Sequence, residues 1–324
     1  MKRSAITGFA ALAVAVITAA GCAEDFESFN VVSKLRVLAI QAEPPELLPG
    51  ESTELSALVY EPDGDDISYS WSWCPLATGA STGYECAVSE DDIEQLAESV
   101  FPGAGDLFPG FDLGHEPTAT MSHSIDPMIL QGFCDAILSS GAPSFVTLPD
   151  CEEELVVTVR LEVSAGGESV TAVKEVALKM SDEAVVNSNP VIGDAEATGG
   201  GSSGAVEMPQ GEATELYGDT TYDLFVAVPQ ESSEPYVPAP TDEVPDPEET
   251  SEAMFMSWFV TGGSTDFKRT TFLPGEIGLD ELGSNSWKTP KADESAGAAT
   301  LFLVLQDERG GVAWTERRID LVER

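Results

Sequence analysis

The chain has 324 residues, enough for about two domains, and 42% of them are hydrophobic, which is enough to build ordinary cores. Charge is the unusual feature, because 57 acidic residues stand against 15 basic ones and the net charge at pH 7 is −42. A field of that sign repels nucleic acid and anionic head groups, so nucleic acid is excluded as a partner, and it favours solubility, cations and basic partners.

Residues 1–21 have the layout of a secretory signal peptide. Lys2 and Arg3 form a basic start, and the stretch 6–20 that follows is apolar or small, without a charge. At about 15 residues this stretch is shorter than the roughly 20 that a bilayer-spanning helix needs. We therefore expect a leader that is removed on export.

The sequence TAAGC at 18–22 resembles the lipobox of bacterial lipoproteins, although Ala19 stands where that family most often has leucine. The resemblance implies that Cys22 is lipidated and that residues 22–33 form a tether to the membrane. Two or three acyl chains hold a protein stably at a bilayer. Ala23 replaces the aspartate that retains such proteins in the inner membrane, so the resemblance favours the outer membrane, on its periplasmic or surface face. The alternative is a secreted protein with an unmodified Cys22.

Setting Cys22 aside leaves an even number of cysteines: Cys74, Cys86, Cys134 and Cys151. In an exported protein these predict two disulfides. Three pairings are possible, and we favour Cys74–Cys86 and Cys134–Cys151 because both are local. The spacing contains no CxxC pair, so zinc is not expected.

Alternation of apolar and polar residues predicts antiparallel strands in a first domain, 34–181. The run Ile67, Tyr69, Trp71 and Trp73 alternates, and Gly166-Gly167 predicts a hairpin turn. Two capped amphipathic stretches, 89–100 and 126–141, predict short helices inside an insert at about 88–140.

A second domain is predicted at 182–324. The stretches 221–229 and 254–263 are predicted to be strands, and 299–321 is predicted to be a long hairpin. Between the first two lies a Pro-rich acidic segment, 229–253, which we expect to be a disordered or extended loop.

The two halves repeat one plan. Each has a tryptophan strand, YSWSWC at 69–74 and FMSWFV at 255–260, and each ends in a hairpin on a double glycine. Laying Gly166-Gly167 on Gly310-Gly311 puts Val173 near Trp314 and Leu178 on Leu321. A buried tryptophan on a middle strand suits an immunoglobulin-like sandwich.

The motifs EPDGDDISYSW at 61–71 and RGGVAW at 309–314 resemble bacterial Ig-like, PKD-like and cadherin-like modules, and the layout resembles two-domain lipoproteins of myxobacteria. The resemblance implies a mainly β protein with two tandem Ig-like antiparallel β-sandwich domains, the first with a short helical insertion. Such modules serve many functions.

Few residues suggest chemistry. Asp63, Asp65 and Asp66 are oxygen ligands that suit calcium, but the EF-hand spacing is absent and a hairpin turn favours the same residues. His115 and His123 would lie about 25 Å apart on an extended segment, and no HExxH or GxSxG motif accompanies them.

The tryptophans are a further group of candidates, because exposed ones could stack on sugars. We expect Trp71, Trp258 and Trp314 in the cores and Trp287 to be the exposed one.

The sequence therefore favours a lipid-anchored envelope protein with a non-catalytic binding or structural role. It predicts no enzyme activity and no cofactor, apart from the calcium candidates, and a protein or surface polymer as partner. Two alternatives stay open: a calcium-dependent adhesion module, and an accessory or unrecognised secreted hydrolase.

Overall fold

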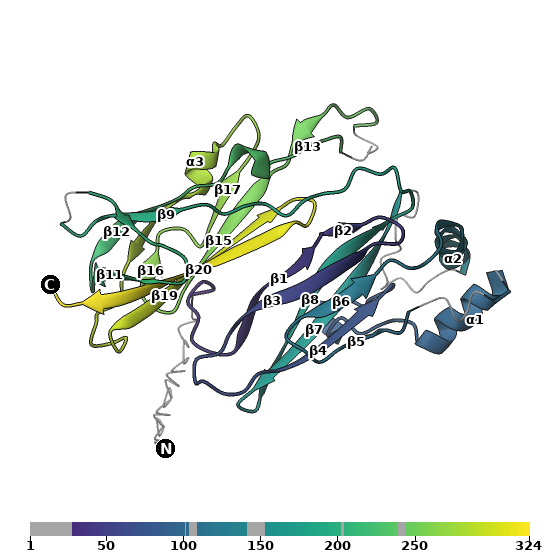
Figure 1. The fold of residues 1–324 in the computed structure, drawn as a ribbon, viewed down its shortest axis with the longest axis horizontal. Coiled ribbons are helices and arrows are strands. Elements are labelled where there is room, and N and C mark those ends of the chain that lie inside the picture. Colours follow the sequence, from purple (N-terminus) through teal and green to yellow (C-terminus); the bar gives the residue numbers. More distant parts are fainter. Residues whose placement is uncertain (1–27, 101, 104–108, 141–152, 202–203, 239–243) are drawn as a thin grey trace, which may run out of the picture.

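A computed structural model describes residues 28–100, 102–103, 109–140, 153–201, 204–238 and 244–324 (Figure 1). Within these residues the strands form two pairs of facing sheets and one small two-stranded ribbon. No helix in this part of the chain is long and apolar enough to cross a membrane.

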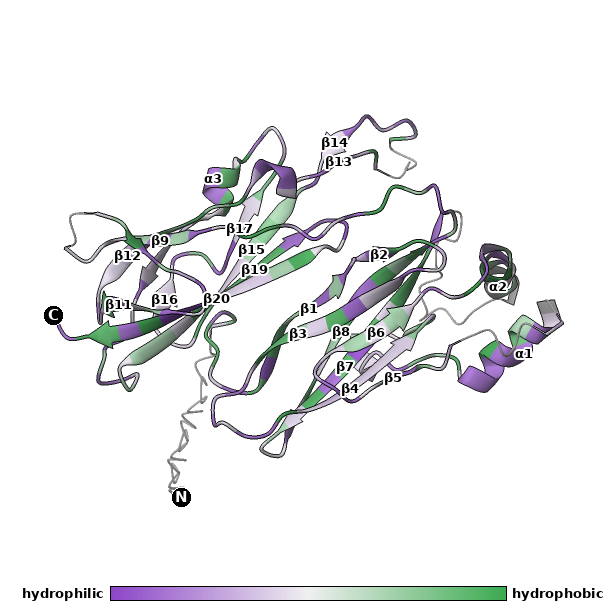
Figure 2. Ribbon diagram, in the orientation of Figure 1, coloured by the Kyte–Doolittle hydropathy of each residue, from purple (hydrophilic) through white to green (hydrophobic). Residues whose placement is uncertain are grey.

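The first sandwich is built from residues 36–179. One of its sheets has the order β1 (Arg36–Glu43), β3 (Ser52–Tyr60) and β6 (Ala119–Ser122). The other has the order β2 (Glu46–Leu47), β8 (Glu168–Lys179), β7 (Glu154–Ala165), β4 (Ser68–Cys74) and β5 (Asp112–Gly114). Apolar and polar residues alternate along β7 and β8 in Figure 2, and the apolar side chains of β7 fill the core.

The second sandwich is built from residues 195–322. One sheet has the order β10 (Val206–Glu207), β9 (Ala195–Gly199), β12 (Thr221–Val226), β18 (Ser284–Lys288) and β16 (Ser264–Thr265). The other has the order β11 (Ala213–Tyr217), β20 (Val312–Val322), β19 (Ala298–Asp307), β15 (Met254–Val260) and β17 (Arg269–Phe272). A short helix, α3 (Leu279–Leu282), contacts β15 and β17.

The predicted repeat is present in the register of the strands. Trp71 of β4 pairs with Leu161 of β7, and Trp258 of β15 pairs with Leu303 of β19. The last strand of each sandwich also pairs in parallel with an early strand. Leu178 of β8 and Leu321 of β20 occupy equivalent positions in these two pairs. Both tryptophans are fully buried. The prediction of two Ig-like sandwiches is therefore confirmed, with two parallel strand pairs in otherwise antiparallel sheets.

The double glycines do not align. In the first hairpin Ala165 pairs with Glu168, which leaves Gly166 and Gly167 as the turn. In the second, Asp307 bonds to Gly311, so the turn is the longer Glu308-Arg309-Gly310. Val173, predicted to fall near Trp314, takes the register position of Glu316, two residues further along β20.

The insert near one end of the first sandwich contains α1 (Glu90–Val100) and α2 (Pro127–Ser140). The Ser89 hydroxyl accepts the Asp92 N–H, and Asp126 accepts the Met128 N–H, so both predicted N-caps are present. The stretch is not purely helical, because β5 and β6 lie between the helices and complete the two sheets.

The structure corrects the expectations for Trp287 and Trp314. Trp287 is fully buried, on β18, because its polar neighbours alternate with it and point away from the core. Trp314 is half-buried on the outer face of β20 and packs between the two sandwiches.

The acidic segment 229–253 is more ordered than expected at both of its ends. A single 3-10 turn (Gln230–Ser232) is followed by β13 (Pro235–Tyr236), which pairs with β14 (Thr250–Ser251). Ser232, Ser233 and Glu252 are buried. Residues 28–33, expected to be tether, are also held in place, since Val31 bridges to Val260 of β15.

The two sandwiches pack against each other through sheet faces that would otherwise meet solvent. Figure 1 shows β1 and β3 beside β19 and β20, and β1 contacts β20. An apolar cluster fills this interface: Val32, Ala39, Phe259, Phe302, Val304 and Val312, with Leu38, Leu58, Tyr60 and Trp314 around them. The Tyr60 and Phe302 rings meet edge to face, with centroids 5.9 Å apart.

We expect Phe302→Ala to lower the free energy of unfolding by about 3 kcal/mol, because it empties the centre of this interface. Urea denaturation measures the change. The matched control is Phe225→Ala, since Phe225 is 40% exposed on the outer face of β12 and its loss should cost less than about 1 kcal/mol. An equal loss of unfolding free energy in the two variants would contradict the burial of Phe302 in an interface between the sandwiches.

Candidate functional site

Six charged side chains and the amide of Asn187 gather at the rim of the interface between the sandwiches, where β2, β8, the acidic segment and the hairpin 307–311 meet. We call this group the junction cluster. It consists of Glu46, Lys174, Lys179, Asn187, Glu252, Asp307 and Arg309.

Arg309 lies at the centre of the junction cluster. Its Nη2 is 3.1 Å from Glu46 Oε2 in the first sandwich, and its Nη1 is 3.2 Å from Glu252 Oε1 in the second. Glu46 also forms an ion pair with Lys179 Nζ at 3.2 Å and accepts the Asn187 N–H at 2.7 Å. One guanidinium therefore ties together residues that are far apart in the chain.

Asp307 organises the hairpin that carries Arg309. Its carboxylate accepts the Gly311 N–H at 2.7 Å and the Asn187 side-chain amide at 3.2 Å. A Cβ on residue 311 would collide with this carboxylate, so glycine is required there for close approach. Lys174 of β8 donates to the Gly310 carbonyl, which ties the turn to the first sandwich.

Burial governs the electrostatics of the junction cluster. Glu252 is 0% exposed, and burial together with the charge of Asp307 raises its pKa to about 7, against the opposing effects of the Glu234 N–H and Arg309. Burial also raises the pKa of Asp307 and lowers that of Lys174. Because its acids are buried and each already has a partner, the cluster suits a structural connection better than reaction with a substrate.

The calcium candidates Asp63, Asp65 and Asp66 lie in an exposed turn. The turn is organised by Glu61, whose carboxylate accepts the N–H groups of Asp63, Gly64 and Asp65. Among the described residues, no group of three or more His, Cys, Asp or Glu side chains is arranged to hold a metal ion.

The two histidines lie in different surroundings. His123 is 0% exposed, its Nε2 is 2.9 Å from the Lys179 carbonyl, and burial lowers its pKa. His115 is exposed, with Nδ1 3.3 Å from the Tyr69 carbonyl. Neither has a partner arrangement typical of a catalytic base.

The disulfide Cys74–Cys86 is confirmed, with Cα atoms 5.5 Å apart. Cys134 is buried and also disulfide-bonded. Cys151 and Cys22 lie outside the described residues, so the pairing of Cys134 with Cys151 and the lipidation of Cys22 stay predictions.

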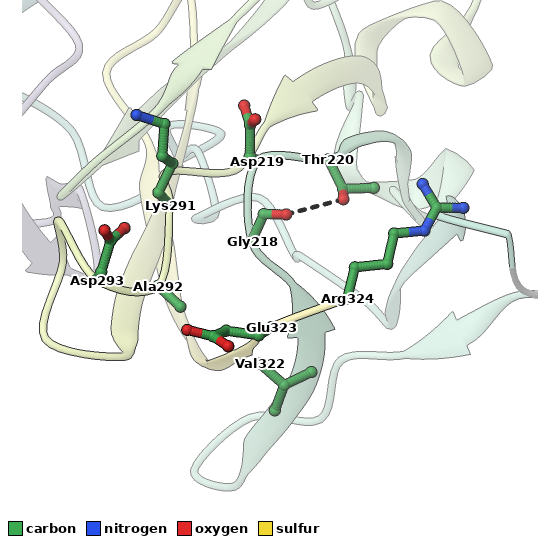
Figure 3. Close-up of a pocket in the computed structure, with 9 residues that line it drawn as sticks. All are labelled: Gly218, Asp219, Thr220, Lys291, Ala292, Asp293, Val322, Glu323 and Arg324. Atoms are coloured by element: carbon green, nitrogen blue, oxygen red, sulfur yellow. Dashed lines mark hydrogen bonds between the residues drawn. The ribbon is translucent and has the colours of Figure 1, made fainter.

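A shallow pocket of about 300 Å³ lies at one end of the second sandwich (Figure 3). Its lining includes Asp219, Thr220 and Lys291, but the Thr220 hydroxyl is used in a bond to the Gly218 carbonyl. Asp219 pairs with Lys288 at 2.9 Å, and Lys291 pairs with Glu294 at 2.5 Å. These groups serve neighbouring residues and do not converge on a ligand position.

Sequence reasoning did not identify the junction cluster. The bond between Arg309 and Glu46 spans 263 positions, so no local spacing announces it. The available signal was the run DERGG at 307–311, where charged residues and two glycines crowd a turn longer than the first one.

Comparison with known proteins adds little. No protein-family model matches the chain, and no curated protein matches it. Among solved structures it is similar to the three N-terminal domains of the Highly Immunogenic Outer Capsid protein (Hoc) of bacteriophage RB49, at 12% identity and a TM-score of 0.20. The match covers 89% of this chain and 59% of that one, so the chain spans less than two thirds of the neighbour. The fold assignment rests instead on the strand order given above.

We expect Arg309→Met to lower the free energy of unfolding by about 3 kcal/mol at pH 7, because Glu46 and Glu252 lose the buried cation that they share. Urea denaturation again measures it. The control is Arg318→Met, since Arg318 pairs with Glu316 on the same strand but its side chain is 63% exposed, and no measurable change is expected. An unchanged free energy of unfolding in Arg309→Met would show that the junction cluster does not stabilise the contact between the sandwiches.

Proposed function

We propose that the chain is a lipid-anchored envelope protein whose paired sandwiches act as one rigid binding or structural unit, without catalysis. The observation that carries the proposal is the interface between the sandwiches, which combines an apolar centre with the junction cluster at its rim. Domains joined by a short linker move independently unless such an interface is large and apolar. A locked pair suits a support or an adaptor.

The start of the described chain supports this proposal. The Val32 N–H donates to the Val260 carbonyl, the Val260 N–H donates to the Asn30 carbonyl, and both bonds are 2.8 Å long. Arg36 stacks on the Phe29 ring at 4.6 Å. A chain extends at most about 3.5 Å per residue, so a lipid on Cys22 would lie within roughly 20 Å of Ser28, at the end of the interface where Val31 meets Val260. The membrane would then hold the middle of the pair.

The partner is proposed to be a protein or a surface polymer with basic or cation-binding character. The net charge of −42 favours such a partner through long-range attraction. Loops and outer sheet faces would carry the contacts.

We expect Cys22→Ser to abolish incorporation of labelled palmitate and to move the protein from the membrane fraction to the soluble fraction, because the thiol is the proposed attachment point. Metabolic labelling and fractionation measure both effects. Ala23→Ser changes the next residue without removing the thiol and should keep the wild-type behaviour. Unchanged labelling in Cys22→Ser would refute the anchor.

The same pair of proteins tests the binding role. In-cell crosslinking, pulldown and mass spectrometry should recover a discrete partner set with the wild type and lose it with Cys22→Ser. No enrichment in either form, or saturable hydrolysis of a substrate panel by the wild type, would contradict a non-catalytic adaptor.

A further inference from the structure

Cations without an acidic partner gather at one place in this acidic chain. Residues 22–324 contain 13 basic residues, since Lys2 and Arg3 account for two of the 15. Six of the 13 form ion pairs, Lys174 and Arg317 are buried, and Arg324 is the last residue of the sequence. The other four form no ion pair with any described residue, and all lie beside the start of the described chain: Lys34, Arg36, Lys268 and Arg269.

The start of the described chain brings Lys34 and Arg36 to one end of β15. The chain bridges there to Val260, the last residue of this strand. The Arg36 guanidinium lies over the Phe29 ring at 4.6 Å and over the Phe259 ring at 5.3 Å. Arg36 is therefore held against two aromatic rings instead of an acid.

The strand β17 brings the other two cations to the same face of β15. Arg269 pairs with Ser257, and its Nε is 3.4 Å from the Ser257 hydroxyl. Ser257 and Phe259 are two residues apart on β15, so they point to the same side of the sheet. Lys268 comes immediately before Arg269 and is exposed. All four cations therefore lie in one region around Phe259.

Two exposed aromatic rings lie among these cations. Phe29 is 47% exposed and Phe267 is 60% exposed. Asn30 Nδ2 donates to Thr265 Oγ1 at 2.6 Å, and Thr265 Oγ1 donates to the Phe267 carbonyl at 2.9 Å, so the two segments are held together. We call the resulting group the basic patch, and it consists of Phe29, Lys34, Arg36, Phe267, Lys268 and Arg269.

The chemistry of the basic patch suits a phospholipid surface. Lys and Arg side chains are attracted to lipid phosphates, and exposed aromatic rings enter the boundary between head groups and acyl chains. A free polyanion would have to approach against the net charge of −42, whereas a lipid on Cys22, six residues before Ser28, would hold a bilayer beside the patch. The tether would supply the encounter, and the patch would only have to set the orientation.

Acids border the basic patch at Asp266 and in the turn 61–66. Tyr60, the register partner of Arg36, leads into this turn. The turn runs towards the other sheet of the first sandwich, where Asp65 lies against Gly166. Charges are screened over about 8 Å at physiological ionic strength, so these acids limit the extent of the contact and do not cancel the attraction within it.

We propose that the basic patch is the surface with which the protein lies against a bilayer that contains anionic phospholipids. This docking rests on the lipid anchor proposed above. The junction cluster then faces away from the membrane, because Asp307 pairs with Met254 at the opposite end of β15 from Val260.

The first experiment measures which end of the full-length, lipidated protein meets the bilayer. A fluorophore is attached through Ser264→Cys, next to Thr265, or through Ser188→Cys, next to Asn187 of the junction cluster, since both serines are exposed. The protein is added to vesicles of phosphatidylcholine, with or without phosphatidylglycerol, that also contain nitroxide-labelled lipid. Quenching should be strong at position 264 when phosphatidylglycerol is present and weak at position 188 in either vesicle.

Charge variants test whether the basic patch causes this orientation. One cation at an anionic surface contributes about fivefold to binding. Lys34→Gln and Lys268→Gln should therefore each lower the ratio of docked to undocked protein, calculated from quenching at position 264, by about that factor. Lys268→Arg keeps the charge and should behave as the wild type. The matched control is Arg160→Gln, which removes one positive charge from the outer face of the first sandwich and should leave the ratio unchanged.

Palmitate labelling of each protein separates the docking from the anchor. Absent labelling would refute the anchor, and with it the docking. Normal labelling with equal quenching at positions 264 and 188, with quenching that does not depend on phosphatidylglycerol, or with no effect of Lys34→Gln and Lys268→Gln would overturn the docking alone.

Discussion

The outer face of β19 and β20 is apolar and has to be shielded from water. The arrangement of the two sandwiches depends on how this face is covered. Strand register places Phe302 and Val304 where the first sandwich has Arg160 and Glu162. In the first sandwich these two form a partly exposed ion pair at 3.1 Å, and in the second the two apolar side chains are buried against β1 and β3. The equivalent sheet face is therefore solvated in the first sandwich and buried in the second. The buried apolar face of β19 and β20 fixes how the two sandwiches pack together.

The junction cluster has a different task from the apolar centre. Desolvation cancels much of the Coulomb attraction of a buried ion pair, so such pairs contribute little net stability. Leaving one partner unpaired is costly, however, and this penalises any sliding of the apolar faces. The longer turn of the second hairpin serves this purpose, because Glu308, Arg309 and Gly310 occupy the place of Gly166 and Gly167 and carry a cation across to Glu46.

Much of the fold follows from the sequence because it depends on local patterns. Alternation identified β4 and β7, capping residues identified both helices, and the repeat matched Leu178 with Leu321 before any register was known. Trp287 was misplaced because β18 is short and Trp287 is its single apolar residue, so no alternation of apolar residues marks the strand. The site was missed because Asn187 and Glu46 lie 141 positions apart in the chain, and Glu46 and Arg309 lie 263 apart, so no local pattern brings them together.

Two separate segments meet at the junction cluster, and a third is held at the opposite end of β15. The hairpin 307–311 reaches the first sandwich and the base of the acidic segment rests on that hairpin, near Met254 at the start of β15. The start of the described chain lies instead at Val260, where β15 ends. A change in any one of them therefore reaches the contact between the sandwiches. The hydroxyl-rich outer face of β4, β7 and β8 stays exposed, as do the loops, and these are the surfaces that the proposed partner would contact. Binding there would leave the junction intact, so partner recognition and the locking of the pair can be altered independently.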